Sequence, residues 1–131
     1  MWTTEQDIPA DFQIDWTYLA GWFDGEGCAG IYPNSNNYPR TMLIFTSTDE
    51  IVMRLISEFL QANNVKANIH INGSHNAINH NWSTSYGIEV TRKLDVKFIA
   101  KKLIPLCITK RKALTEVFKF LTGEEPIAEE W

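Results

Sequence analysis

Apolar positions recur at helical spacing in several stretches of the chain. The i, i+3, i+4 pattern predicts amphipathic helices over 49–63, 94–103 and 109–121. The stretch 16–25 differs, because apolar and small residues cover it almost all round, which is typical of a buried helix. Candidate capping residues for these helices are Asp15, Asp49 and Gly123.

Four other stretches alternate between apolar and polar residues, as strands do. They cover 28–33, 41–48, 66–72 and 83–91, and polar turn residues within each pair predict two hairpins. The second hairpin encloses a long polar stretch, 73–82, which we expect to be a loop. The expected order is therefore helix, two strands, helix, two strands and two helices.

Length and composition are those of a single domain. The 131 residues divide into an N-terminal arm (1–13), one domain (14–122) and an acidic C-terminal tail (123–131). No run of 18 apolar residues occurs, so we expect no membrane contact. The start of the chain lacks a secretion signal, and its two cysteines suit a reducing compartment, so an intracellular location is expected.

The overall charge, −4, argues against binding to nucleic acid, but its distribution weakens that objection. Half of the sixteen acidic residues lie within the first fifteen or the last eight positions. All twelve Lys and Arg residues lie within 16–123, where the formal charge is +4. The central part is thus mildly basic, with acidic ends.

The stretch 19–27 reads LAGWFDGEG and ends in two carboxylates, Asp24 and Glu26. Gly21 and Gly25 are four residues apart, so they lie on one side of a helix and permit another backbone to approach closely. The simplest interpretation is a buried helix that ends in a glycine-rich turn. The paired glycines and the paired acids indicate more than that.

Two other motifs overlap this stretch, and both fail on context. Residues 25–30 satisfy G-x-G-x-x-G, but a dinucleotide site needs a strand before the motif and a helix after it. Asp24 and Glu26 could open a calcium loop, but Cys28 occupies a ligand position and Ala29 the position of the required glycine.

The stretch 19–27 resembles the signature of the LAGLIDADG homing endonucleases, and the similarity extends over 14–122. The identical residues are Leu19, Ala20, Gly21, Asp24 and Gly27. The resemblance implies an α+β fold, an αββαββα core with a curved antiparallel sheet. It also implies that two such helices pack side by side, so a chain with one motif should be a homodimer. The expected interface residues are Tyr18, Gly21, Trp22 and Gly25.

The same resemblance implies a site-specific double-strand DNA endonuclease with a long pseudo-palindromic target and no small-molecule cofactor. Glu26 would be the metal ligand, together with Gly25, and the ion would be Mg²⁺ or Mn²⁺. The family's basic residue corresponds to Lys110, with Lys112 as second choice, although both could simply be solvated at a helix start. Asp49 matches a position near the attacking water, but an N-cap role is an equal alternative.

The free face of the sheet would enter the major groove of double-stranded DNA, where asparagine can read adenine and arginine guanine. The candidate contact residues are Tyr32, Asn34, Asn36, Asn37, Arg40, Thr46, Asn68, His70, Asn72, Ser83, Ser85 and Arg92. His70, His75 and His80 recur every five residues, but no cysteine or carboxylate beside them completes a zinc site.

Two alternatives remain open. The chain could be a related DNA- or RNA-binding protein that does not cleave, acting as a repressor or an intron maturase. It could also be an interaction protein that uses the helix pair only to dimerise. The presence of Glu26 favours cleavage, whereas the modest basicity of the chain does not.

Overall fold

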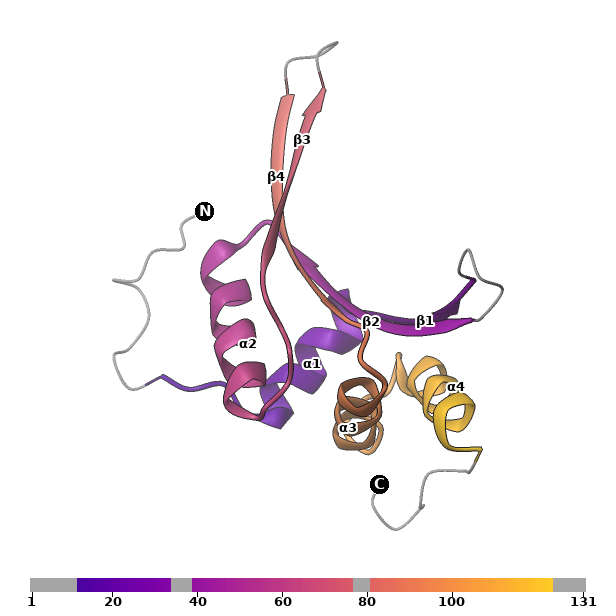
Figure 1. Cartoon of the computed structure of the whole chain (residues 1–131). Coiled ribbons are helices and arrows are strands. Elements are labelled where there is room, and N and C mark those ends of the chain that lie inside the picture. Colours follow the sequence, from indigo (N-terminus) through magenta and orange to yellow (C-terminus); the bar gives the residue numbers. More distant parts are fainter. Residues whose placement is uncertain (1–11, 34–38, 77–80, 124–131) are drawn as a thin grey trace.

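The structure is a computed structural model that describes residues 12–33, 39–76 and 81–123, with the backbone alone for 72–76 and 81–83. Its elements in chain order are α1 (Trp16–Glu26), β1 (Cys28–Tyr32), β2 (Arg40–Ser47), α2 (Glu50–Ala62), β3 (His70–Asn76), β4 (Asn81–Val90), α3 (Lys93–Leu103) and α4 (Arg111–Thr122). This order confirms the α+β fold expected from the sequence (Figure 1).

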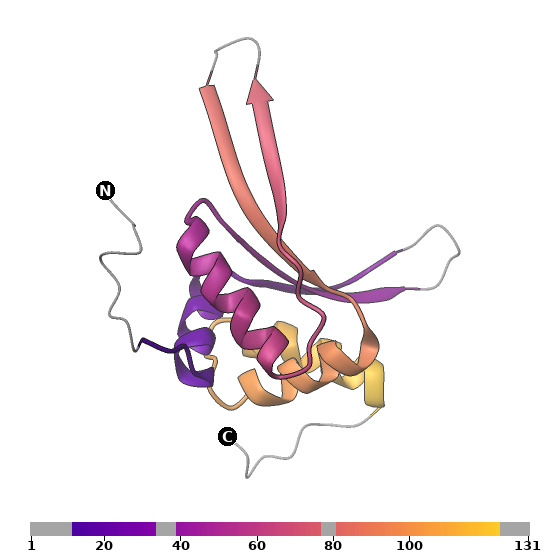
Figure 2. The ribbon, with the colours of Figure 1, turned by 60° about the vertical axis from the view of Figure 1, so that its left-hand side comes forward.

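The four strands form one antiparallel sheet in the order β1-β2-β4-β3. The two hairpins meet where β2 pairs with β4, so the sheet is continuous but strongly curved (Figure 1). The helices lie on one side of it, and the β3–β4 hairpin extends beyond them as an arm (Figure 2). The opposite side of the sheet is left open within the described structure.

The hydrophobic core lies between the sheet and the helices. The fully buried strand residues include Leu43, Phe45, Ile88 and Val90, which alternate with more exposed neighbours. They face a set of fully buried helix residues that includes Leu19, Phe23, Met53, Ile56, Leu60, Ile99, Leu103 and Leu114. Alternation along the strands therefore decides which face of the sheet the helices cover.

The helix ends follow the expected capping chemistry. A carboxylate oxygen of Asp15 accepts a hydrogen bond of 2.8 Å from the backbone N–H of Tyr18, which satisfies a free donor at the start of α1. Gly123 ends α4 with φ of 74°, a left-handed conformation that favours glycine. The expected caps at Asp15 and Gly123 are thus confirmed.

The prediction for the second hairpin is wrong in its boundaries. Residues 66–69 are not a strand, because their backbone bonds to helix side chains instead. The N–H of Lys66 donates to Asp95, and the carbonyl of Ala67 accepts from the Ser57 hydroxyl at 2.7 Å. The β3–β4 pairing instead runs out to Asn76, through much of the predicted loop.

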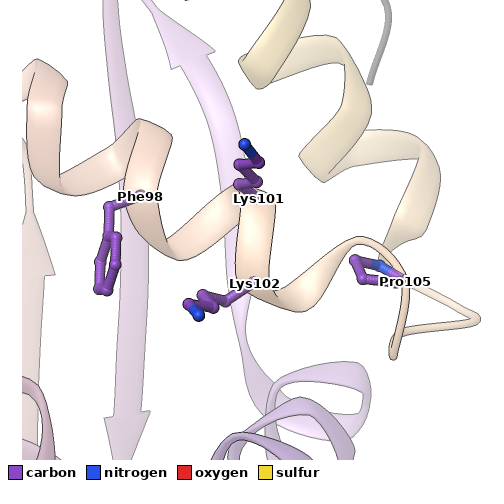
Figure 3. A pocket seen from close by; sticks show the side chains of 4 residues that line it. All are labelled: Phe98, Lys101, Lys102 and Pro105. Atoms are coloured by element: carbon purple, nitrogen blue, oxygen red, sulfur yellow. The ribbon is translucent and has the colours of Figure 1, made fainter. Parts of the chain in front are cut away.

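The apolar spacing in 66–72 and 94–103 predicts that Ile71 and Phe98 are buried, but both are exposed. Ile71 is 67% exposed, since it lies on the hairpin arm beyond the helices. Phe98 lies at the surface of α3 in a pocket of about 430 Å³ that also includes Lys101, Lys102 and Pro105 (Figure 3). The Lys102 amine lies 5.8 Å from the centroid of the Phe98 ring, a cation–π distance that favours this partly exposed position.

No helix within residues 12–33, 39–76 and 81–123 is both long enough and apolar enough to span a bilayer.

Candidate active site and nucleic-acid interface

One face of α1 points away from the rest of the chain. Tyr18, Gly21 and Gly25 are exposed, and a Cβ built on either glycine would meet nothing within 4 Å. Their spacing places them on one side of the helix. Trp22, expected beside them, is half-buried and stacks on Phe45 with ring centroids 5.8 Å apart. The prediction of a helix buried all round is therefore only partly right, because a single chain leaves this small-residue face open.

Asp24 ties the end of α1 to the turn that precedes α4. Its two carboxylate oxygens accept hydrogen bonds from the backbone N–H groups of Ile108, at 2.8 Å, and Lys110, at 2.9 Å. Burial acts to raise the pKa of Asp24, but these backbone hydrogen bonds outweigh it and hold the pKa below its usual value. Asp24 is thus a structural residue at the helix end.

The same contacts explain why α4 begins at Arg111 rather than at the predicted Thr109. The N–H groups of Ile108 and Lys110 are held by Asp24, so the chain between them passes over the end of α1 before it turns into the helix. The hydrogen bond to Asp24 therefore fixes the backbone of Lys110 beside the end of α1.

Lys110 also approaches α1 through its side chain. Its ammonium group donates a hydrogen bond of 2.6 Å to the carbonyl oxygen of Gly27, the residue after Glu26. Lys112, the second choice, is exposed in the first turn of α4. Arg111 donates from Nε to the carbonyl of Ile104 at 2.9 Å, toward the α3–α4 turn. Of these three cations, Lys110 is the one whose hydrogen bonds place it beside the end of α1.

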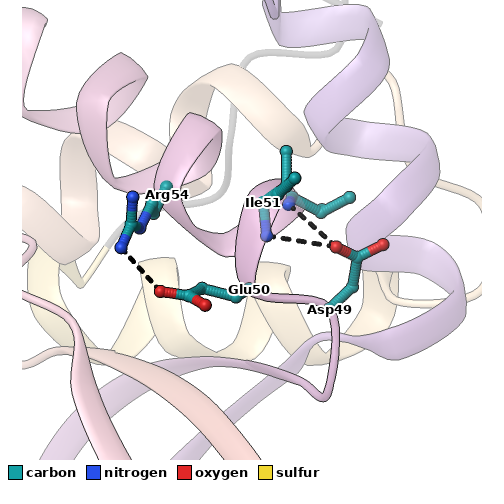
Figure 4. A network of polar contacts seen from close by, with 5 residues as sticks. Asp49, Glu50, Ile51 and Arg54 are labelled. Carbon is teal, nitrogen blue, oxygen red and sulfur yellow. Dashed lines mark hydrogen bonds and ion pairs between the residues drawn. The ribbon is translucent and has the colours of Figure 1, made fainter. Parts of the chain in front are cut away.

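Asp49 forms the N-cap of α2. One of its carboxylate oxygens accepts hydrogen bonds from the backbone N–H groups of Ile51, at 3.1 Å, and Val52, at 3.2 Å. Figure 4 shows this cap beside the exposed ion pair of Glu50 with Arg54, whose atoms lie 2.7 Å apart. This geometry establishes the capping role. The second carboxylate oxygen of Asp49 takes part in neither of these two hydrogen bonds.

Tyr18 connects the two remaining acidic candidates. Burial raises the pKa of the Tyr18 hydroxyl, and the negative charges of Asp49 and Glu26 raise it further. Glu26 is exposed at the last position of α1. Glu26 and Lys110 thus both lie at the C-terminal end of α1, whereas Asp49 lies at the start of α2.

The free face of the sheet carries most of the predicted contact residues that can be placed. The register pairs Tyr32 with Arg40, and it puts Thr46, Gly87 and His70 in one row across the sheet. Because side chains alternate along a strand, these rows share the face opposite to Leu43 and Phe45. Asn72 pairs with Ser85, and Ser83 lies in β4, so their backbone positions belong to the same face.

Five predicted contact residues fall outside this surface or outside the described residues. Asn34, Asn36 and Asn37 lie outside the described residues. Asn68 is exposed but precedes β3. Arg92 precedes α3 and its guanidinium lies 3.3 Å from the buried carboxylate of Asp95, which gives it a structural role there.

Sequence reasoning missed several members of the free face. Cys28, Ile44 and Glu89 form one row across β1, β2 and β4, and Met42 lies in the next row beside Gly30. The Glu89 carboxylate lies 4.0 Å from the His70 ring nitrogen. Alternation already placed Met42 and Ile44 with Thr46, but their apolar character kept them off the list of contact candidates. The centre of this face is consequently apolar, with polar groups around it.

The described residues of a single chain gather no group of three or more His, Cys, Asp or Glu residues that could hold a metal ion. His80 lies outside the described residues, and His75 is described only in its backbone, so the zinc alternative gains no support from them.

No protein-family model and no curated protein matches the sequence, but solved structures match the fold. The homing endonuclease I-CvuI, in complex with its target, superposes with a TM-score of 0.62 at 18% identity, over 87% of this chain and 69% of that one. The archaeal intron-encoded homing endonuclease I-Vdi141I, complexed with DNA, gives 0.63 at 14% identity, over 82% and 67%.

The LAGLIDADG homing endonuclease I-GzeII, in complex with a DNA target, gives a TM-score of 0.61 at 14% identity, over 90% of this chain but 39% of that one. In another I-CvuI complex the match spans 64% of the I-CvuI chain, so this chain is shorter than the proteins it matches. The order of elements, the single curved sheet and the helix at 16–26 all agree with these structures. The chain has the fold of the LAGLIDADG homing endonucleases.

Proposed function

We propose that this protein is a site-specific DNA endonuclease that cleaves both strands as a homodimer. The observation that carries the proposal is the hydrogen bond between the Lys110 ammonium group and the Gly27 carbonyl. This contact holds a positive charge at the end of α1, beside the residue that follows Glu26. The same helix has one open face. Similarity of fold to proteins solved in complex with DNA supports the same function.

The open face of α1 supports pairing with a second copy. Gly21 and Gly25 leave room for another backbone, and no side chain of the described structure covers them. Pairing across a two-fold axis would bury this face on both copies and would bring two Glu26 carboxylates together. A single chain supplies one half of such a site, which accounts for its small number of acidic donors.

The curved free face of the sheet supports binding in the major groove of double-stranded DNA. It presents Tyr32 on β1, Arg40 and Thr46 on β2, and His70 on β3. Two copies related by a two-fold axis would read two related half-sites. The preferred target should accordingly be a pseudo-palindrome, and selection of bound sequences from a random duplex pool would identify it.

The residues at the centre suit a divalent ion in type, once two chains contribute. Carboxylate oxygens are the ligands that Mg²⁺ prefers, and Glu26, with the backbone at Gly25, would hold it. When bound, the ion would activate a water and stabilise the charge that develops on the scissile phosphate. Lys110 would hold a further positive charge at that phosphate, and the Asp49 carboxylate would orient the water from the start of α2.

Replacement of Glu26 by glutamine tests this function. The variant keeps the shape of the side chain and removes its charge, so cleavage of the selected target in Mg²⁺ should fall by orders of magnitude, at about tenfold per 1.4 kcal/mol of lost stabilisation. Binding should persist or improve, since repulsion between carboxylate and phosphate is relieved. Glu58→Gln, at an exposed position in α2, is the matched control and should cut normally.

Equal cleavage by Glu26→Gln and the wild-type protein would end the catalytic assignment. If the wild-type protein binds its selected target and never cuts it, the protein is a DNA reader of the same fold. If no duplex is retained at low salt, the interaction-protein alternative is the correct one.

A further inference from the structure

A second pocket lies at the far end of the sheet, away from Glu26. It has a volume of about 430 Å³ and opens between the start of β2, the end of β4 and the ends of α3 and α4. Arg40, Thr41, Thr91, Lys93 and Phe120 are among the residues that line it. Its volume is that of an ordinary small-molecule site, and the proposed cleavage reaction does not use it.

The polar groups around this pocket favour an anion. Arg40, from β2, and Lys93, from the first position of α3, are exposed cations that both line it. The 11-residue helix α3 starts at the pocket, and the side chain of Arg92 before it makes no capping hydrogen bond. The first N–H groups of a helix attract anions, because they are aligned with its dipole.

Thr41 is the observation that points to a ligand. The residue is 3% exposed, lines the pocket, and its hydroxyl oxygen has no hydrogen-bond partner among the described residues. A buried hydroxyl without a partner is unfavourable, so such groups are rare in folded proteins. Rotation about the Cα–Cβ bond of Thr41 to another staggered rotamer would bring the hydroxyl to the position of the methyl group. A ligand oxygen in the pocket would then be its hydrogen-bond partner.

We propose that this pocket binds a phosphate group carried by a nucleoside. Arg40, Lys93 and the threonine hydroxyls provide donors for the phosphate. The ring of Phe120, which is 49% exposed, provides an apolar wall for a base or sugar. Two sources share this chemistry, a free nucleotide and the backbone of DNA beyond the sheet. Arg40 also belongs to the free face of the sheet, so DNA bound on that face would pass close to the pocket. Only this DNA source rests on the proposed function.

Titration of the ¹⁵N-labelled full chain tests the pocket, with inorganic phosphate and deoxyadenosine monophosphate as probes. The amide signals of Thr41, Thr91 and Lys93 should shift with the nucleotide, and more weakly with phosphate. Lys93→Gln should weaken nucleotide binding about tenfold, the loss expected for one charge-assisted hydrogen bond. Lys97→Gln, one turn further along the exposed side of α3, is the matched control and should bind normally.

Thr41→Val provides a second variant, because it keeps the shape of the side chain and removes the hydroxyl. Without ligand, it should melt at the same temperature as the wild-type protein or above it, since no hydrogen bond is lost. With the nucleotide it should bind more weakly than the wild type. A variant that melts lower and binds the nucleotide equally well would show that the hydroxyl has a structural role instead, and would overturn its assignment as a ligand group.

Duplex binding then separates the two sources. If DNA is the source, Lys93→Gln should weaken binding of a long duplex and reduce the slope of log affinity against log salt by about one. If the nucleotide binds and duplex affinity is unchanged by Lys93→Gln, a free nucleotide is the ligand. A chain that binds the nucleotide but no duplex leaves the pocket assigned and refutes the proposed endonuclease function. Absence of amide shifts with both small probes, together with unchanged duplex binding, overturns the proposal.

Discussion

The ammonium group of Lys110 donates a hydrogen bond of 2.6 Å to the carbonyl oxygen of Gly27, across 83 positions of sequence. The same residue donates its backbone N–H to Asp24, so two contacts fix it at the end of α1. A flexible lysine is therefore held at the end of α1, against the backbone of the residue that follows Glu26. A preorganised cation of this kind is the arrangement that stabilises developing charge with little reorganisation.

Lys110→Met should therefore affect both stability and cleavage. Methionine keeps most of the side-chain volume but loses the hydrogen bond, so the free energy of unfolding should fall by about 1 kcal/mol. Cleavage of the selected target should fall much further, by about a hundredfold or more, while binding changes little. Denaturant unfolding and single-turnover cleavage measure the two effects. Lys112→Met, an exposed neighbour in α4, is the control; equal losses in the two variants would refute the assignment of Lys110.

Asp24→Asn should lower stability in a pH-dependent way. Asparagine offers one acceptor oxygen where the carboxylate offers two to Ile108 and Lys110, so we expect a loss of about 1–3 kcal/mol at neutral pH. The pKa of Asp24 in the folded chain lies below its ordinary value of 3.8, so its stabilisation is fully present above that value and lost as the pH falls through the folded pKa. The difference between the two proteins in urea unfolding should accordingly shrink below about pH 4. A constant difference from pH 7 to pH 2 would contradict this role of the charge.

Gly21→Leu should separate assembly from folding. A Cβ at Gly21 meets nothing within 4 Å in the single chain, so the variant should fold normally, but its side chain would keep two α1 helices apart. Sedimentation should then show a folded monomer. Gly27→Ala is a useful contrast, because its Cβ would overlap the ring of Phe23 and should destabilise the chain itself. An intact Gly21→Leu dimer would show that α1 does not form the interface.

The two cysteines should differ sharply in reactivity. Burial, together with the nearby charge of Asp24, raises the pKa of the Cys107 thiol to about 12. At pH 8 this thiol stays protonated and enclosed, whereas Cys28 is exposed on the free face of the sheet. Iodoacetamide should therefore label Cys28 alone in the folded protein and both residues in urea, as read by mass spectrometry. Rapid labelling of Cys107 without denaturant would contradict the packing around Asp24.

Local patterns in the sequence predicted the elements that depend on neighbouring residues. The apolar spacing in 49–63 and the carboxylates of Asp15 and Asp49 identify helices and their starts, because helix periodicity and capping involve residues at most four apart. Alternation in β2 placed Leu43 and Phe45 on the buried face for the same reason. The boundaries of β3 were mispredicted, since hydrogen bonds from Ser57 and Asp95 compete there for the backbone.

The sequence by itself determined the order of elements, the buried stripes and the motif at 19–27, because each of these is written in residues that are close along the chain. Only the tertiary structure decided that Lys110, rather than Lys112, contacts the end of α1, and that Asp24 is engaged by backbone groups 84 and 86 positions away. It likewise decided that Met42, Ile44 and Glu89 share the free face with the predicted polar residues. These relationships depend on how the packed core brings distant segments together, and no local spacing encodes that.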